Sequence, residues 1–414
     1  MTKQVSTSWA GMLMAGLLYA AVGTGTAQAA EQAIQNRDVA NALTEAKKQA
    51  AKKQWSAALA SLDKADGVAG KSAYADYKID EFRAYVLTQQ RQYGAAAAVF
   101  EKLAGSSEAP SAQVPTQLKT AAQLYSRAGQ NAKAAQVGQR ALKLRPQDSE
   151  LLQLVGQSQY TAKNYRAAAA TMQQLVSLSE KQGKKPEEGW LQIILNSQYQ
   201  VNDKDGIARS WMSLLRYYPK QQYWERVLDM KTAGVQPEPI ELGYQRLMFD
   251  VGVLKDPRDY EDLAMNSIES GAPAEAVRVL QHGLQSGQFE GASEARFKRM
   301  LEYAQKAVAA DENKLQQEVQ TAQSADTGQP SVDLGRAYLG QQRYDDAISA
   351  LQQGIKKGKL KNEDQARLDL GIAYLRKDER RQAQQTFASV ESKSEWRDLA
   401  DLWRLHAMTA NTAN

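Results

Sequence analysis

The sequence predicts an all-α protein in which pairs of antiparallel helices stack into a solenoid. Apolar and small residues recur three or four positions apart over segments of helical length. Five such segments share the same internal spacing, and no segment alternates polar and apolar residues for long enough to indicate a strand. Because a solenoid grows by adding units to one continuous core, we expect the 414 residues to form one elongated domain.

The most complete segment is SVDLGRAYLGQQRYDDAISALQQGI, which predicts one helix, a short polar turn and a second helix. The first helix contains Leu334, Gly335 and Tyr338, and the second contains Ala347 and Leu351. Gly335 and Ala347 are small enough to let the two helix backbones approach closely. Leu351 then fills the space between neighbouring hairpins, so we expect it to be a core residue.

Four further segments repeat this spacing over much of the chain. They contain Tyr125, Gly129, Ala134, Ala141 and Pro146; Gly156, Tyr165, Ala168, Met172 and Leu175; Leu263, Ala264, Gly271, Ala276 and Leu280; and Leu370, Gly371, Tyr374, Ala383 and Phe387. The pattern resembles the tetratricopeptide repeat, in which Leu-Gly, Tyr, Ala-x3-Phe and Pro recur over 34 residues. The resemblance implies an α-solenoid of tetratricopeptide-like helix hairpins, with Phe100 and Phe387 in its core. Trp396 and Trp403 predict a C-terminal capping helix, because the last hairpin of a solenoid needs cover.

The pattern is weakest in the middle of the chain. Gly234, Pro237 and Pro239 predict an irregular turn, and residues 293–323 predict two longer helices that separate near Asp311. We therefore expect a signal peptide over residues 1–29, N-terminal tetratricopeptide-like repeats over 30–230, irregular helical repeats over 231–325, and C-terminal repeats with the capping helix over 326–414.

The first thirty residues predict a secretory signal peptide. Lys3 is their only charged residue, an apolar stretch runs from Trp9 to Val22, and Ala27-Gln28-Ala29 offers small residues for cleavage. The apolar stretch is shorter than the ~20 residues that span a bilayer, which favours cleavage over an uncleaved anchor. A cleaved chain would be periplasmic, and since the sequence has no cysteine, it has no disulfides and no thiolate metal site.

The sequence contains no recognisable catalytic constellation, so we expect a protein that is not an enzyme and that needs no metal and no cofactor. The motifs HExxH, GxSxG and a phosphate-binding Gly-Lys-Ser loop are all missing. Of the two histidines, His282 is expected to be exposed and His406 to pack against its neighbours rather than to bind a ligand. The formal charge of +5 is too small for a chain of this length to indicate nucleic-acid binding.

Two clusters of lysines allow two interpretations. They are Lys47, Lys48, Lys52 and Lys53, and Lys356, Lys357, Lys359 and Lys361. The simpler interpretation is a solvated helix face and a polar turn. The alternative is a docking point for anionic lipid headgroups or an acidic partner, which would place the protein peripherally at the envelope.

The first helices of stacked hairpins line the concave wall of a solenoid, where extended partner segments bind. The helical phase predicts nine inward-facing residues in three successive hairpins: Lys119, Gln123 and Arg127; Gln153, Gln157 and Tyr160; and Gln192, Asn196 and Tyr199. Amide side chains can pair with both the N–H and the C=O groups of a peptide, and tyrosines add flat contact area. Lys119 and Arg127 would suit a carboxylate. We therefore expect a protein or peptide partner on this wall, although a solvated helix face would also be rich in glutamine.

The middle of the chain is similar in sequence to the repeat proteins that accompany TonB–ExbB–ExbD systems. The similarity lies in Trp190-Leu191-Gln192, Tyr199, Tyr217-Tyr218-Pro219-Lys220 and Tyr223-Trp224. It implies an accessory role in TonB-dependent transport across the outer membrane. The alternative is a chaperone-like or assembly factor for outer-membrane or exported envelope components. Both would be periplasmic scaffolds for protein–protein interaction.

Overall fold

A computed structural model describes residues 34, 36–234, 237–287 and 292–409. The predicted signal peptide, residues 1–29, lies outside the described residues. Within them, the secondary structure consists of α-helices joined by turns. Close contacts divide the chain into unit 1, which ends at Ser210, and unit 2, which begins at Trp211. We describe each unit by itself.

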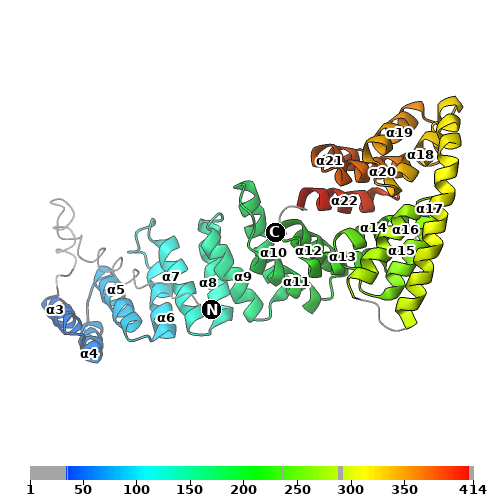
Figure 1. The fold of residues 1–414 in the computed structure, drawn as a ribbon. Helices are drawn as coiled ribbons and strands as arrows, with labels where there is room; N and C mark the ends of the chain where they lie inside the picture. The colour runs from blue at the N-terminus through cyan, green and yellow to red at the C-terminus, as the bar shows by residue number, and fades with distance from the viewer. Residues whose placement is uncertain (1–33, 35, 235–236, 288–291, 410–414) are drawn as a thin grey trace. The chain divides into compact units, whose positions relative to one another are not determined.

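Unit 1 is a stack of helix hairpins, and each helix from α3 to α11 packs against the next (Figure 1). Its helices are α3 (Arg37–Ala51), α4 (Trp55–Asp66), α5 (Ala73–Gln89), α6 (Tyr93–Ala104), α7 (Val114–Arg127), α8 (Asn131–Leu144), α9 (Ser149–Thr161), α10 (Tyr165–Lys181) and α11 (Glu188–Gln200), and α12 (Lys204–Tyr217) crosses into unit 2. Phe100 is buried in the core of this stack, as the sequence predicts.

Unit 2 continues the pattern, and each helix from α13 to α22 packs against the next. The helices are α13 (Gln221–Thr232), α14 (Glu238–Asp250), α15 (Pro257–Glu269), α16 (Pro273–Gln285), α17 (Ala292–Ser324), α18 (Gln329–Gly340), α19 (Tyr344–Lys357), α20 (Glu363–Arg376), α21 (Arg380–Ala388) and α22 (Arg397–Thr409). Leu351 and Phe387 are fully buried, and so are Trp396 and Trp403 of the C-terminal cap. The predicted all-α stack of hairpins is therefore confirmed.

One local prediction was wrong: residues 293–323 do not form two helices split near Asp311. The structure has a single helix of 33 residues, α17. Two physical reasons explain its continuity. No glycine or proline occurs between Ala292 and Ser324 to interrupt the helix. In addition, Leu315, Val319 and Ala322 of its second half pack against the core formed by α18 to α20.

Glycines mark the crossing of the two helices in several hairpins. A Cβ added to Gly335 would lie 2.6 Å from Leu351 Cγ, and one added to Gly371 would lie 2.4 Å from Phe387 Cε1. In unit 1, a Cβ on Gly156 would lie 2.9 Å from Met172 Cε. In each case, the large residue follows the glycine by sixteen positions. The same contact therefore recurs in three hairpins, in the tetratricopeptide-like arrangement that the sequence predicts.

We predict that Gly371→Ala destabilises unit 2. The new methyl group overlaps Phe387, and overpacking of this kind costs about 1–3 kcal/mol, which outweighs the gain of up to about 1 kcal/mol in helix propensity. Urea unfolding followed by tryptophan fluorescence measures the effect, because Phe387 stacks on Trp403 with ring centroids 6.2 Å apart. The control is Gly189→Ala in α11, where an added Cβ meets nothing within 4 Å. Equal stability of the two variants would contradict the tight crossing.

Candidate functional site

The nine predicted partner-binding residues all lie on α7, α9 and α11, the first helices of three successive hairpins of unit 1. We call their surface the first-helix wall of unit 1. The helical period separates it from the buried faces of the same helices, which carry Leu118 and Ala122 in α7, Leu152 and Val155 in α9, and Leu191 and Leu195 in α11. The wall is therefore the face of these helices that does not pack within the hairpins.

The α11 part of the wall is fully on the surface. Gln192, Asn196 and Tyr199 are exposed, and Tyr199, at 50%, is among the most exposed large hydrophobic residues that the structure describes. On the same helix, Ile194 and Leu195 are buried. An amide, a second amide and an aromatic ring thus lie along one solvent-facing stripe.

The α9 part of the wall has the same composition but is less exposed. Gln157 is exposed, whereas Gln153 and Tyr160 are half-buried. The Tyr160 ring meets the ring of Tyr165, the first residue of α10, edge to face, with centroids 5.6 Å apart. This contact favours one orientation of the Tyr160 ring at the end of its helix.

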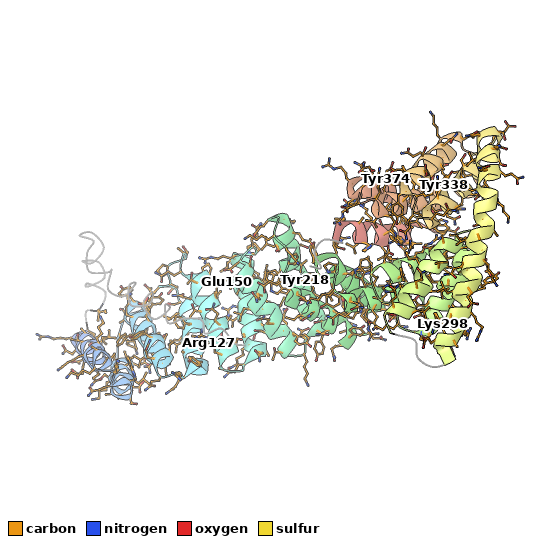
Figure 2. The ribbon with its side chains drawn as sticks, viewed as in Figure 1. Arg127, Glu150, Tyr218, Lys298, Tyr338 and Tyr374 are labelled. Atoms are coloured by element: carbon orange, nitrogen blue, oxygen red, sulfur yellow. The ribbon has the colours of Figure 1, made fainter. Side chains whose placement is uncertain are left out.

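The two cations predicted on α7 differ in their surroundings. Lys119 Nζ donates hydrogen bonds to Asp148 Oδ2 and Glu150 Oε2, each at 2.9 Å. Burial opposes the charge of Lys119, but these two hydrogen bonds prevail and raise its pKa. Lys119 therefore ties α7 to the start of α9, and its charge is already balanced. Arg127, which is labelled in Figure 2, is exposed, and its guanidinium lies 5.9 Å from the centre of the Tyr93 ring. Gln123 is half-buried and lies one turn before it on α7.

A tripeptide that the predicted site does not include repeats behind the wall, as Ser158-Gln159-Tyr160 and Ser197-Gln198-Tyr199. Gln159 and Gln198 are only 1% and 3% exposed. Gln198 Oε1 accepts a hydrogen bond from the Ser210 hydroxyl across its hairpin. In the hairpins of α7, α18 and α20, the equivalent residue is a tyrosine: Tyr125, Tyr338 or Tyr374. In α9 and α11, glutamine takes the inner position and tyrosine follows it, which brings the ring to the wall.

In unit 2, the corresponding face of α20 is covered by α14. Leu368 and Ile372 of α20 stand at inward-facing positions of the repeat, yet each is only 2% exposed. A Cβ on Gly243 of α14 would lie 3.7 Å from Leu368 Cδ2, which shows how closely the two helices approach. The inward-facing side of α20 is therefore not open to a partner, because part of unit 2 itself occupies it.

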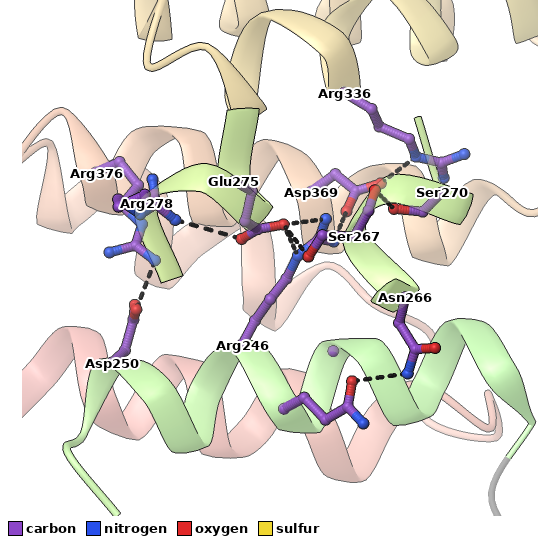
Figure 3. Close-up of polar contacts among 12 residues, drawn as sticks. Arg246, Asp250, Asn266, Ser267, Ser270, Glu275, Arg278, Arg336, Asp369 and Arg376 are labelled. Atoms are coloured by element: carbon purple, nitrogen blue, oxygen red, sulfur yellow. Dashed lines mark hydrogen bonds and ion pairs between the residues drawn. The ribbon is translucent and has the colours of Figure 1, made fainter. Parts of the chain in front are cut away.

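A network of buried charges joins α14 to this face of α20 (Figure 3). Arg246 of α14 binds Glu275 at 2.7 Å, and Asp250 of α14 binds Arg376 of α20 at 2.5 Å. Asp369 of α20 accepts a hydrogen bond from Arg336 of α18 at 2.7 Å.

The carboxylates of this network differ in the direction of their pKa shifts. Burial alone would raise the pKa of Glu275, but Arg246 lowers it. At Asp250, burial prevails over the nearby cations and raises the pKa. None of these residues was predicted from the sequence, although Asp369 between Leu368 and Leu370 is a charge in an otherwise apolar run.

Helix α22 completes the cover of α14. Trp403 Nε1 donates to the Gly243 carbonyl at 3.3 Å. A Cβ added to Gly243 would lie only 2.4 Å from Leu399 Cδ2, so the two helices pack closely at this glycine. Lys231 of α13 also pairs with Asp398 of α22. The cap predicted from Trp396 and Trp403 therefore closes the last hairpin and also contacts α13 and α14, at the start of unit 2.

The two histidines lie in aromatic surroundings. His406 is packed between Trp224 and Trp403, with both ring centroids 6.0 Å away, and its Nε2 lies 4.0 Å from Asp250 Oδ2. Burial lowers the pKa of His406, although Asp250 opposes this effect. The predicted packing role of His406 agrees with these contacts. His282 is exposed and stands beside the ring of Phe249.

In the part of the chain that the structure describes, no helix combines the length and the apolar character needed to cross a membrane. Among the same residues, no group of three or more His, Asp and Glu side chains is arranged to hold a metal ion.

Comparison with known proteins gives similarity at the level of fold. No protein-family model matches the chain, and no curated protein matches it. A solved tetratricopeptide repeat protein from Parabacteroides merdae is 13% identical, with a TM-score of 0.30 over 90% of this chain and 100% of that one. The complex of Naa15 and Naa10 bound to HypK is 15% identical, with a TM-score of 0.32 over 86% of this chain and 59% of that one. The TPR2AB domain of yeast Sti1, in complex with HSP90, is 15% identical, with a TM-score of 0.24 over 72% of this chain and 99% of that one.

We predict that Glu275→Leu destabilises unit 2 by about 3–5 kcal/mol, because it removes a buried carboxylate and leaves the half-buried Arg246 and Arg278 without their shared partner. Adding Arg246→Met should recover a large part of this loss, since the pair is then replaced by apolar groups. Chemical unfolding of the single and double variants checks the expectation. The control is Glu294→Ala, which removes an exposed pair with Lys298 and should cost less than about 1 kcal/mol. A similar small loss in Glu275→Leu would mean that the network is not buried.

We also predict a pH dependence of stability from His406. Because its pKa is lowered in the folded state, the unfolded chain binds a proton first as the pH falls below about 6.5. The free energy of unfolding should therefore fall between pH 7.5 and 6, by at most about 1.4 kcal/mol per pH unit from this residue. The charged groups around it are Asp250, Arg376 and Arg380. His406→Gln should flatten the dependence in this window, and an unchanged slope would rule out His406 as its source.

Proposed function

We propose that the protein is a non-catalytic scaffold of the cell envelope that binds an extended segment of a partner protein on the first-helix wall of unit 1. The observation that carries this proposal is the contrast between the two units. The residues at inward-facing positions of α11 are exposed, whereas Leu368 and Ile372 of α20 are buried under α14. The open wall therefore belongs to unit 1.

The chemistry of the wall suits a peptide main chain. Gln157, Gln192 and Asn196 are exposed amides, and each can donate to a carbonyl and accept from an N–H group. A strand or extended peptide presents both groups at every residue. Tyr160 and Tyr199 add aromatic contact area with a polar end, which is a common feature of protein interfaces.

Arg127 supplies the exposed cation of the wall. Its guanidinium lies over the Tyr93 ring. It forms no hydrogen bond to a carboxylate of the residues that the structure describes. Lys119 is neutralised by Asp148 and Glu150. We therefore assign the recognition of a carboxylate or acidic residue of the partner to Arg127, and a structural role to Lys119.

Two features of the sequence support an envelope location for this scaffold. The first is the signal-like segment with Lys3, the apolar stretch from Trp9 to Val22 and the small residues before Ala30. The second is the similarity around Trp190, Tyr199 and Tyr218 to the repeat proteins that accompany TonB–ExbB–ExbD systems. We propose an accessory role in TonB-dependent outer-membrane transport.

Photo-crosslinking in the native envelope tests the proposal. A photoreactive phenylalanine analogue replaces Tyr199 on the wall or, as the matched control, Tyr303 of α17, which is 55% exposed. Crosslinks from position 199 to an inner-membrane coupling protein or its transporter would support the proposed role. Crosslinks to nascent outer-membrane barrels would support the assembly factor instead. The same pattern of crosslinks from both positions would overturn the wall as the binding site.

We predict that the double variant Tyr160→Ala, Tyr199→Ala weakens binding of the crosslinked partner by at least about tenfold. Interface tyrosines often contribute more than about 1 kcal/mol each, and about 1.4 kcal/mol corresponds to a factor of ten. Helicity should be retained, and titration of the purified proteins measures the affinity. Tyr303→Ala is the control and should bind as the wild type does. An unchanged affinity in the double variant would place the binding site elsewhere.

A further inference from the structure

The turn between α19 and α20 concentrates positive charge. Lys356 and Lys357 are in the last turn of α19, and Lys359 and Lys361 follow before α20 begins. Three of the four are exposed, and Lys357 is half-buried. Within the described part of the chain, none of the four forms an ion pair. We call residues 356–361, which contain these four lysines, the lysine turn.

The backbone of the lysine turn is held in one conformation. Gly358 has φ +72° and ψ −160°, a combination that is almost confined to glycine. Its carbonyl accepts from the Gly328 N–H at 2.8 Å, and the Lys361 N–H donates to Gln329 Oε1 at 2.9 Å. A Cβ on Gly328 would lie 2.0 Å from the Gly354 carbonyl oxygen. The ends of α18 and α19 thus pin the turn, and the lysines project from a fixed base.

Local structure does not account for all four charges. Lysines at the end of a helix are favoured by its dipole, which explains Lys356 and Lys357. Lys361, however, comes directly before Asn362, the N-cap of α20, where a cation is disfavoured by the dipole. The neighbouring carboxylates Glu363 and Asp364 both bind Arg367. Even with the exposed Asp326 counted, the area remains net positive, so helix-end electrostatics account for Lys356 and Lys357 but not for Lys361.

We propose that the lysine turn docks the protein on a membrane surface that contains anionic phospholipid. The turn lies between two hairpins and contains no aromatic residue, and Leu360, its one large apolar residue, packs against the core of α18 to α20. An acidic peptide would need a groove or aromatic contacts for affinity. Compact, hydrated lysine charges instead suit the diffuse negative potential of a bilayer surface. The inference is independent of the first-helix wall.

Co-sedimentation of the full chain with vesicles tests this inference. Equimolar phosphatidylglycerol and phosphatidylcholine vesicles are compared with pure phosphatidylcholine vesicles at low and high salt. The ratio of the two partition coefficients isolates the contribution of charge from any apolar insertion. We expect this ratio to exceed one at low salt and to fall as salt screens the charges.

The decisive variant is Lys356→Gln, Lys357→Gln, Lys359→Gln, Lys361→Gln. Each clustered lysine contributes about a fivefold factor near an anionic surface, so the ratio should fall at least about 30-fold. The control is Lys143→Gln, Lys163→Gln, Lys204→Gln, Lys306→Gln, which removes the same charge from scattered exposed sites and should change the ratio less than fivefold. Circular dichroism checks that both variants remain folded.

Two outcomes would overturn the inference. If both variants lose binding equally, net charge and not the lysine turn governs the attraction. If the wild type does not prefer the phosphatidylglycerol vesicles, the turn is no lipid site. Capture of an acidic protein by the wild type, but not by the clustered variant, would then assign the turn to a protein partner.

Discussion

Much of the structure depends on one constraint: in several hairpins, the two helices cross so closely that the first helix has a glycine beneath a large residue of the second. Gly156, Gly335 and Gly371 lie beneath Met172, Leu351 and Phe387. This crossing assigns one face of each first helix to the core. The opposite face of the first helix does not take part in this packing, and it is either exposed to solvent or covered by another helix.

The two units cover this leftover face in different ways. In α9 and α11, glutamine replaces the inner tyrosine of the repeat and the tyrosine moves to the next position, so amides and rings face solvent. In α20, the same face has Leu368, Asp369 and Ile372, and α14 lies over it. In unit 2, α14 therefore covers the inward-facing side of α20, with ion pairs that favour one arrangement of α14, whereas the corresponding side of α11 in unit 1 is exposed.

The sequence predicts what depends on local spacing. The period of Gly335, Ala347 and Leu351 was sufficient for the hairpins, and helical phase was sufficient to place Gln192, Asn196 and Tyr199 on one exposed stripe. Contacts between distant residues were not predictable in this way. Asp250 meets Arg376 across 126 positions and Lys119 meets Asp148 across 29. Neither spacing reflects a helical period, and α17 was wrongly divided because its continuity depends on packing against α18 to α20.

Cysteine accessibility tests the contrast between the units most directly, because the chain has no cysteine of its own. Single variants Gln157→Cys and Asn196→Cys in unit 1, and Leu368→Cys and Ile372→Cys in unit 2, are treated with a maleimide under native conditions. The account predicts rapid labelling at positions 157 and 196, and labelling at 368 and 372 only at the rate of local opening. Equally rapid labelling at all four positions would show that α14 does not cover this side of α20, and would contradict the account.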